Sequence, residues 1–182
     1  MSDPSIAHTA EETVDFREAP AKAEPLGLSL GLHRLLDFNI LQLANRISTD
    51  FARLYATFGI GIPEWRVLAV LGEQGPVTAN QICHITYMDR AIVSRAVSEL
   101  VDKGYVRREG DPCDRRRIIL HLTESGGVLC SRIVPAARGR QENLLSVLSS
   151  DEIDRLFDSL FTIREKIDRM LEEEIKVDPT TP

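Results

Sequence analysis

The sequence predicts a mainly α-helical protein with one small β-hairpin, on the strength of three observations. Long stretches carry apolar residues at spacings of three and four, the period of an amphipathic helix. Two short segments that look like strands flank a turn-rich stretch containing Gly110 and Pro112, which predicts a hairpin. Two closely joined short helices precede the hairpin. Together these elements predict a winged helix-turn-helix flanked by long helices.

The 182 residues suffice for one domain with its own core, without disulfides or a structural metal. Residues 1–25 are rich in Ala, Pro and Glu and are expected to form a flexible N-terminal arm. The domain then spans 26–176, with a tail at 177–182. Because neither a signal peptide nor a long apolar stretch is visible, a cytoplasmic location is expected.

The first helix is expected at about 28–58, where apolar residues from Leu32 to Tyr55 keep helical spacing up to Gly59. A second helix starts with Pro63 in its first turn, where the missing N–H costs nothing, and runs to Gly72. This helix opens the winged helix-turn-helix, expected at about 62–122.

A capping box of Thr78 and Gln81 opens a short helix from Ala79 to about Ile85. The next helix, 89–103, begins at Asp89, whose carboxylate can cap free N–H groups. The hairpin follows, with strands predicted at 105–109 and 117–122. We take 106–122 as the wing.

Thr123 is expected to cap a long helix reaching about Leu148, although Gly126 and Gly127 weaken its first half. Ser149 and Glu152 form a second capping box, which begins the last helix. These two helices together are expected at about 123–175.

The formal net charge of −6 would alone argue against a nucleic-acid partner. The charge is unevenly distributed, however: residues 103–117 hold six basic side chains against three acidic ones, while acidic residues gather near both ends. A local basic patch can steer DNA even on an acidic protein.

The helix at 89–103 has the composition of a DNA-reading helix. Its period places Val93 and Leu100 among the buried residues, and Arg95 and Ser98 outward. Arginine and serine beside small alanines offer hydrogen-bond donors without bulk, as a major-groove helix requires. An ordinary solvated surface helix is the alternative.

The stretch "DRAIVSRAVSELVDKGYVRREGDPCDRRRIILHLTESG", from residue 89, closely resembles the recognition helix, wing and following helix start of the MarR (multiple antibiotic resistance regulator) family. The stretch "IPEWRVLAVL", residues 62–71, resembles the second helix of that family. The resemblance covers about residues 30–174.

This resemblance implies a transcriptional regulator, in most cases a ligand-responsive repressor. It implies that Arg116 enters the minor groove, held by Asp114, with Arg115 on the DNA backbone. It also implies a homodimer formed through the first helix and the last two, reading a pseudo-palindromic operator. The expected DNA contacts are Thr78, Arg90, Ser94, Arg95, Ser98, Asp114, Arg115 and Arg116.

An aromatic or phenolic acid is the kind of effector that the resemblance implies, bound between the dimerisation helices and the DNA-binding lobe. The candidate residues are His33 and Arg46 on the first helix and Trp65 on the second. An aromatic platform beside a cation suits an aromatic carboxylate. Packing of Trp65 between the first two helices is the competing interpretation.

Other classes of function have less support. No Gly-rich phosphate loop, GxSxG elbow or metal-binding His-Glu-His arrangement is present, so neither an enzyme nor a cofactor is expected. A metal sensor using Cys83, His84 and His121, or a redox sensor using Cys113, stays open as an alternative on the same fold. A fourth possibility is an interaction protein that kept the fold and lost DNA binding.

Overall fold

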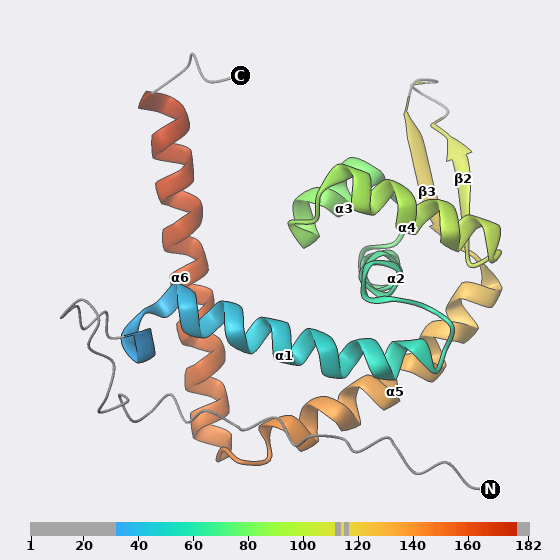
Figure 1. Ribbon diagram of the computed structural model, residues 1–182. Coiled ribbons are helices and arrows are strands. Elements are labelled where there is room, and N and C mark those ends of the chain that lie inside the picture. The colour runs from blue at the N-terminus through green and yellow to red at the C-terminus, as the bar shows by residue number, and fades with distance from the viewer. Residues whose placement is uncertain (1–31, 112–113, 115–116, 178–182) are drawn as a thin grey trace, which may run out of the picture. The chain divides into compact units, whose positions relative to one another are not determined.

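The computed structural model describes residues 32–111, 114 and 117–177 (Figure 1). The expected flexible arm at 1–25 and four residues of the wing tip, 112–113 and 115–116, lie outside this range. The chain divides into two compact units, residues 1–53 and 54–182.

The first unit contains a short 3-10 helix, η1 (Leu32–Arg34), and most of helix α1 (Leu36–Ala56). The single helix expected at 28–58 is therefore shorter at its C-terminal end and interrupted near its start. The Asn39 side chain explains the interruption, because its amide donates hydrogen bonds to the carbonyl oxygens of Leu32 (3.2 Å) and Leu35 (2.7 Å). These bonds hold η1 against the first turn of α1.

The second unit begins with the last turn of α1 and helix α2 (Ile62–Gln74). The predicted end of this helix at Gly72 was wrong, because Gly72 lies inside it. Gly75 ends the helix with a φ of 75°, a left-handed conformation that glycine adopts without strain.

Helices α3 (Ala79–Thr86) and α4 (Arg90–Asp102) form the helix-turn-helix, within one residue of the expected bounds. Beside them lies a three-stranded antiparallel sheet in the order β1-β3-β2, with β1 at Val77–Thr78, β2 at Val106–Gly110 and β3 at Ile118–Leu122. The two-residue strand β1 was not predicted. It exists because Val77 pairs with Leu120 and Thr78 with Ile119.

Aliphatic side chains from α2, α3, α4, the sheet and α5 form one core in the second unit. Val93, Ala96, Val97 and Leu100 are the buried residues of α4, as their spacing predicted. The largest side chains under 2% exposed include Leu68, Ile82, Leu100, Leu120 and Ile133. The core fixes α4 and the hairpin relative to each other.

Helices α5 (Glu124–Leu145) and α6 (Ser150–Val177) complete the second unit. One half of the predicted capping box at α6 is formed: the Glu152 carboxylate accepts hydrogen bonds from the Ser149 N–H (2.9 Å) and hydroxyl (2.7 Å), while the Glu152 N–H donates to the Ser149 carbonyl oxygen (3.1 Å). Among the described residues, no helix combines the length and apolarity needed to cross a membrane.

Candidate nucleic-acid interface

Helix α4 presents a polar face opposite its buried side. Asp89 caps the helix, since its carboxylate accepts a hydrogen bond of 2.7 Å from the Ala91 N–H. The predicted DNA contacts Arg90, Ser94 and Arg95 are all exposed, and Ala91 between them is small. The face therefore offers cationic and hydroxyl donors without bulk, as expected from the sequence.

The arginines of this face differ in their neighbours. The Arg90 guanidinium donates a hydrogen bond of 3.3 Å to the Asn80 side chain of α3, which orients it across the helix-turn-helix. No carboxylate of the described residues lies within ion-pair distance of Arg95. The charge of Arg95 is thus available to an anionic partner.

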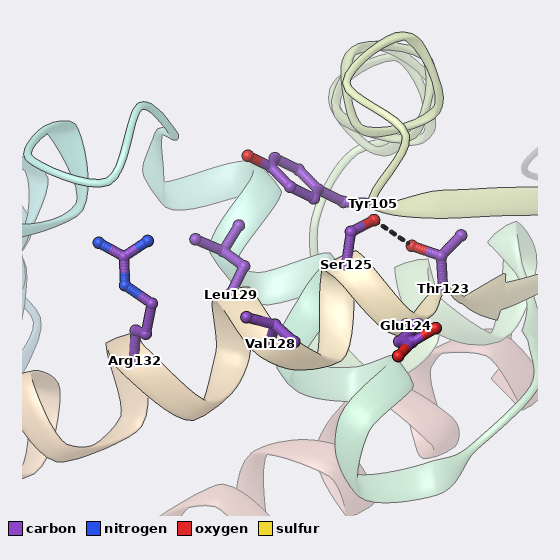
Figure 2. A pocket seen from close by; sticks show the side chains of 7 residues that line it. All are labelled: Tyr105, Thr123, Glu124, Ser125, Val128, Leu129 and Arg132. Atoms are coloured by element: carbon purple, nitrogen blue, oxygen red, sulfur yellow. Dashed lines mark hydrogen bonds between the residues drawn. The ribbon is translucent and has the colours of Figure 1, made fainter.

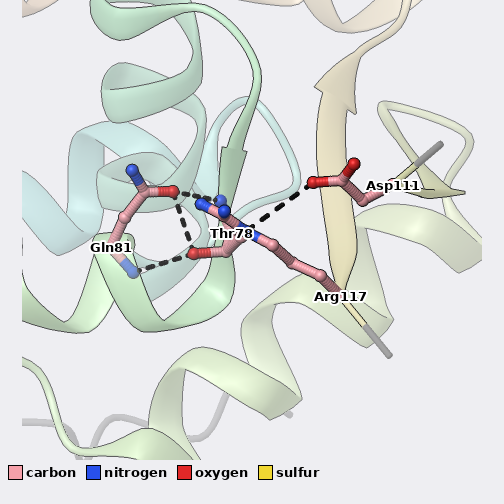
Figure 3. A network of polar contacts seen from close by, with 4 residues as sticks. All are labelled: Thr78, Gln81, Asp111 and Arg117. Carbon is pink, nitrogen blue, oxygen red and sulfur yellow. Dashed lines mark hydrogen bonds and ion pairs between the residues drawn. The ribbon is translucent and has the colours of Figure 1, made fainter. Parts of the chain in front are cut away.

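Thr78, another predicted DNA contact, is the N-cap of α3 (Figure 3). Its hydroxyl accepts a hydrogen bond of 3.3 Å from the Gln81 N–H, and the Gln81 side chain accepts one of 2.9 Å from the Thr78 N–H. The predicted capping box is confirmed. The register of Thr78 with Ile119 brings the beginning of β3 close to this helix start.

Asp111, Asp114 and Arg117, the described residues near the end of the hairpin, are joined by backbone hydrogen bonds and an ion pair. The Asp111 N–H bonds to the Arg117 carbonyl oxygen, and the Arg117 N–H to that of Asp114, both at 2.9 Å. The Arg117 guanidinium lies 3.9 Å from the Asp111 carboxylate (Figure 3). Asp114 is exposed, while the predicted minor-groove residues Arg115 and Arg116 lie outside the described range.

The outer face of the hairpin carries a charge cluster that neutralises one arginine. Arg107 and His121 are cross-strand partners, and the Glu109 carboxylate contacts both, with 3.3 Å to His121 Nε2. The hydrogen bond and charge of Arg107 lower the pKa of Glu109, so this carboxylate is ionised at neutral pH. Arg107 is therefore compensated within the protein.

Arg108 points the other way, toward α4, and sequence reasoning missed it. Its guanidinium donates a hydrogen bond of 2.9 Å to the hydroxyl of Ser98, a predicted DNA contact that is only partly exposed. Alternation along a strand could have placed the side chains of Arg107 and Arg108 on opposite faces. The contact with Ser98 joins β2 to α4, so no local sequence pattern could have predicted it.

The hairpin is fixed to the beginning of α5 by short backbone contacts. The Thr123 N–H bonds to the carbonyl oxygen of Tyr105 (3.0 Å), and the hydroxyls of Thr123 (2.7 Å) and Ser125 (2.9 Å) both donate to that of Gly104. Gly126 is buried against Tyr105, and a Cβ atom there would overlap the Tyr105 carbonyl oxygen. This close approach explains why the third residue after Thr123 is a glycine.

An open pocket of about 620 Å³ lies at this junction (Figure 2). The Arg132 guanidinium at one side lies 5.8 Å from the centroid of the Phe58 ring, and no carboxylate of the described residues pairs with it. The pocket thus joins aromatic, aliphatic and cationic groups with one carboxylate, that of Glu124. Its lining residues are Tyr105, Thr123, Glu124, Ser125, Val128, Leu129 and Arg132.

The residues predicted to bind an effector lie elsewhere. His33 is in η1 and Arg46 is an exposed residue of α1, both in the first unit, whereas Trp65 is in the second. Trp65 stacks on Tyr55, with ring centroids 5.3 Å apart and planes inclined by 28°. This contact gives Trp65 a packing role between α1 and α2. Burial raises the pKa of Tyr55, and the charge of Arg66 partly opposes that rise.

The cysteines and the possible metal ligands are the candidate groups for a redox or metal sensor. Cys83 and Cys130 are free and partly exposed, and burial raises the pKa of the Cys130 thiol, which disfavours the reactive thiolate. Cys113 lies outside the described range. Within that range, no three His, Cys, Asp or Glu side chains are close enough together to hold a metal ion.

The helix-turn-helix α3–α4, with the antiparallel hairpin β2–β3 beside it, defines a winged helix-turn-helix protein. A sequence profile of the MarR family matches residues 58–117. A MarR/EmrR family transcriptional regulator from Acinetobacter sp. ADP1 has a similar structure, with a TM-score of 0.67 and 34% identity over 72% of this chain and 93% of its own. The chain belongs to the MarR family of transcriptional regulators.

Two relatives with curated names are also similar. The chain is 32% identical to the HTH-type transcriptional repressor NicR of Pseudomonas putida, over 56% of this chain and 62% of that repressor. It is 30% identical to an uncharacterized HTH-type transcriptional regulator of Mycobacterium leprae, over 60% of this chain and 76% of the relative. The match thus spans less than two thirds of the length of NicR.

Proposed function

We propose that this chain is a sequence-specific, double-stranded-DNA-binding transcriptional repressor without enzymatic activity. Helix α4, within 89–103, would enter the major groove, and the wing at 106–122 would reach the minor groove. The observation that carries the proposal is the exposed face of α4, where Arg90, Ser94 and Arg95 flank Ala91. Family membership and the repressor name of the Pseudomonas putida relative support the direction of regulation.

We expect the active form to be a cytoplasmic homodimer on a pseudo-palindromic operator. The apolar stripe of α6 supports this proposal, because Phe157, Phe161 and Leu171 are 40–52% exposed in the single chain. A second copy would cover this stripe and place two recognition helices about one helical turn of DNA apart, ~10 base pairs.

The division of labour among the DNA contacts can be tested by substitution. We expect Arg95→Ala to weaken operator binding by roughly 1–3 kcal/mol and to affect random duplex much less, because a base contact discriminates between sequences. Arg116→Ala would cost a similar amount if its guanidinium occupies a minor groove. Arg138, exposed on α5, provides a control arginine whose removal should have little effect. Equal losses on both DNAs for Arg95→Ala would contradict base reading.

Repression is proposed to be relieved by a small aromatic acid. Two sets of candidate residues are proposed: first, the sequence-predicted residues His33, Arg46 and Trp65, and second, the pocket beside α5, where Arg132 offers a cation near aromatic rings. Such an acid releases DNA only if it prefers a dimer whose recognition helices are wrongly spaced for the operator. Ligand and DNA must then weaken each other's binding reciprocally.

The effector proposal is tested by titrating the operator complex with salicylate, benzoate and related aromatic acids or their thioesters. Release that Arg46→Ala and Trp65→Ala abolish would support the first set. Release that only Arg132→Ala abolishes would support the second. If none of the compounds changes operator affinity, relief by aromatic acids is wrong, while DNA binding itself is unaffected by that result.

A further inference from the structure

Two consecutive arginines of β2 have opposite environments. Arg107 lies on the outer face of the hairpin, where Glu109 neutralises it. Arg108 lies on the face toward α4 and donates its hydrogen bond to Ser98. Both side chains are exposed, so burial does not distinguish them. Their electrostatic partners do.

Arg108 has no anionic partner within the described part of the chain. No carboxylate there lies within ion-pair distance of its guanidinium, and its hydrogen bond is to a neutral hydroxyl. A guanidinium carries five N–H donors, so most of them remain available after the bond to Ser98. Arg108 therefore presents an uncompensated positive charge with free donors at a fixed place.

That place is the junction between the two elements proposed to enter the grooves. Ser98 lies one helical turn after Ser94 and three residues after Arg95, at the edge of the polar face of α4. Arg108 is in the strand that leads from α4 to the wing tip. A phosphate backbone separates the major groove from the adjacent minor groove, and this junction would face it.

We propose that Arg108, oriented by Ser98, forms a binding site for one backbone phosphate of duplex DNA between the recognition helix and the wing. The proposal rests on the DNA-binding function proposed above and adds a contact absent from the predicted set. The planar guanidinium can offer two parallel N–H groups to a phosphate. The Ser98 hydroxyl, which accepts from Arg108, keeps its own hydrogen to donate to the same phosphate.

A phosphate contact has a signature that a structural contact lacks. Each phosphate neutralised by the protein adds about −0.9 to the slope of log K against log salt concentration. In a dimer with one such contact per protomer, loss of Arg108 should reduce the magnitude of that slope by about 2. If the hydrogen bond from Arg108 to Ser98 only held β2 to α4, the loss of Arg108 would leave the slope unchanged.

The test compares Arg108→Gln with Arg107→Gln, using fluorescence anisotropy on an operator duplex and a random duplex over a range of salt concentrations. Arg108→Gln keeps a donor for Ser98 and removes the charge. We expect this substitution to weaken binding to both duplexes by roughly tenfold or more. It should also lower the magnitude of the salt slope by about 2. Arg107→Gln should keep the parental slope, because Glu109 already compensates that charge.

Arg108→Lys retains the charge and should retain the slope, which separates charge from shape. Parental slope and affinity in Arg108→Gln would overturn the phosphate site, as would equal slope changes in the two Gln variants. A loss confined to the operator would also overturn it, because a phosphate contact acts on any sequence. If the parent protein binds neither duplex, the proposed function itself fails, and that outcome is visible before any variant is measured.

Discussion

Lys103, directly after the recognition helix, holds its ammonium group 3.6 Å from the carboxylate of Glu64 at the beginning of α2. The same ammonium donates a hydrogen bond of 3.0 Å to the Gly59 carbonyl oxygen. Glu64 also accepts one of 3.1 Å from the Gly61 N–H, which is the half of a capping box that remains possible when the N-cap residue is a glycine. One carboxylate thus connects the start of α2 with the end of the recognition helix.

Loss of this carboxylate should destabilise the protein. Glu64 is only 7% exposed, so Glu64→Ala leaves the Gly61 N–H and Lys103 without their partner. We expect the free energy of unfolding to fall by about 1–3 kcal/mol, measured by urea denaturation. Glu73→Ala, at an exposed position of the same helix, is the control and should change it by less than about 0.5 kcal/mol. Equal effects of the two substitutions would contradict the connecting role.

Glu64 and Glu99 of α4 are neighbouring carboxyl groups whose pKa values are shifted in opposite directions. Burial would raise the pKa of Glu64, but the hydrogen bond with Glu99, backbone N–H groups and Lys103 together lower it. The hydrogen bond and the charge of Glu64 raise the pKa of Glu99, despite opposing charges on Lys103 and Arg95. When Glu99 is protonated, it can donate a hydrogen bond to the ionised carboxylate of Glu64.

The raised pKa of Glu99 fixes the sign of a pH effect. A group whose pKa is higher in the folded state stabilises the protein below its unfolded pKa, and this contribution is lost as pH rises through the folded value. The Glu99→Gln variant keeps a hydrogen-bond donor for Glu64 at every pH, whereas the parent loses its donor as Glu99 ionises. The stability of the variant relative to the parent should therefore increase from acidic to neutral pH. Thermal unfolding of both proteins between pH 4 and 8 measures this; a constant difference would show that the pair does not share a proton.

Two adjacent glycines of α5 should respond in opposite directions to alanine. At Gly126 a Cβ would overlap the backbone of Tyr105, so Gly126→Ala should destabilise the protein by roughly 1–3 kcal/mol and disturb the base of the wing. At Gly127 nothing lies within 4 Å of an added Cβ, and Gly127→Ala should stabilise the helix by about 0.5–1 kcal/mol. Denaturant midpoints of the two variants measure these effects. If both substitutions destabilised the protein, the start of α5 would tolerate no side chain at either position.

The apolar stripe of α6 predicts self-association. Leu160 lies on the stripe and is 40% exposed, so Leu160→Asp should shift a dimer toward monomer by placing a charge in the contact. Thr162, on the opposite side of the helix, is the control site, and Thr162→Asp should leave the mass unchanged. Light scattering at micromolar concentration gives the masses. A parent protein of monomer mass would rule out the proposed dimer.

Local signals made most elements predictable. The capping box at Thr78 and the bond from the Ser149 N–H to Glu152 each join residues three apart, so the sequence alone could reveal them. Gly72 misled because glycine is tolerated inside a helix, and the real end at Gly75 depends on a positive φ. The strand at Val77 escaped notice because two residues carry no periodic signal and need Leu120 as a partner.

The surface proposed to bind DNA was predictable only in part. The exposed arginines of α4 follow from helical periodicity, which also identifies its buried side. The compensation of Arg107 by Glu109 and the bond from Arg108 to Ser98 depend on strand register and on packing between elements. Such contacts decide which of several basic side chains is available to DNA. The composition of the sequence does not distinguish these side chains from one another.

The most direct test of the central claim is the binding of the parent protein to duplex DNA. An operator is first selected from a random pool, and its affinity is measured by anisotropy against salt concentration, beside a scrambled duplex of the same length. We predict tight, salt-dependent binding of two protomers per operator, at least about 10³-fold tighter than to the scrambled duplex. Failure to select any preferred sequence, or equal affinity for the two duplexes, would contradict a sequence-specific regulator.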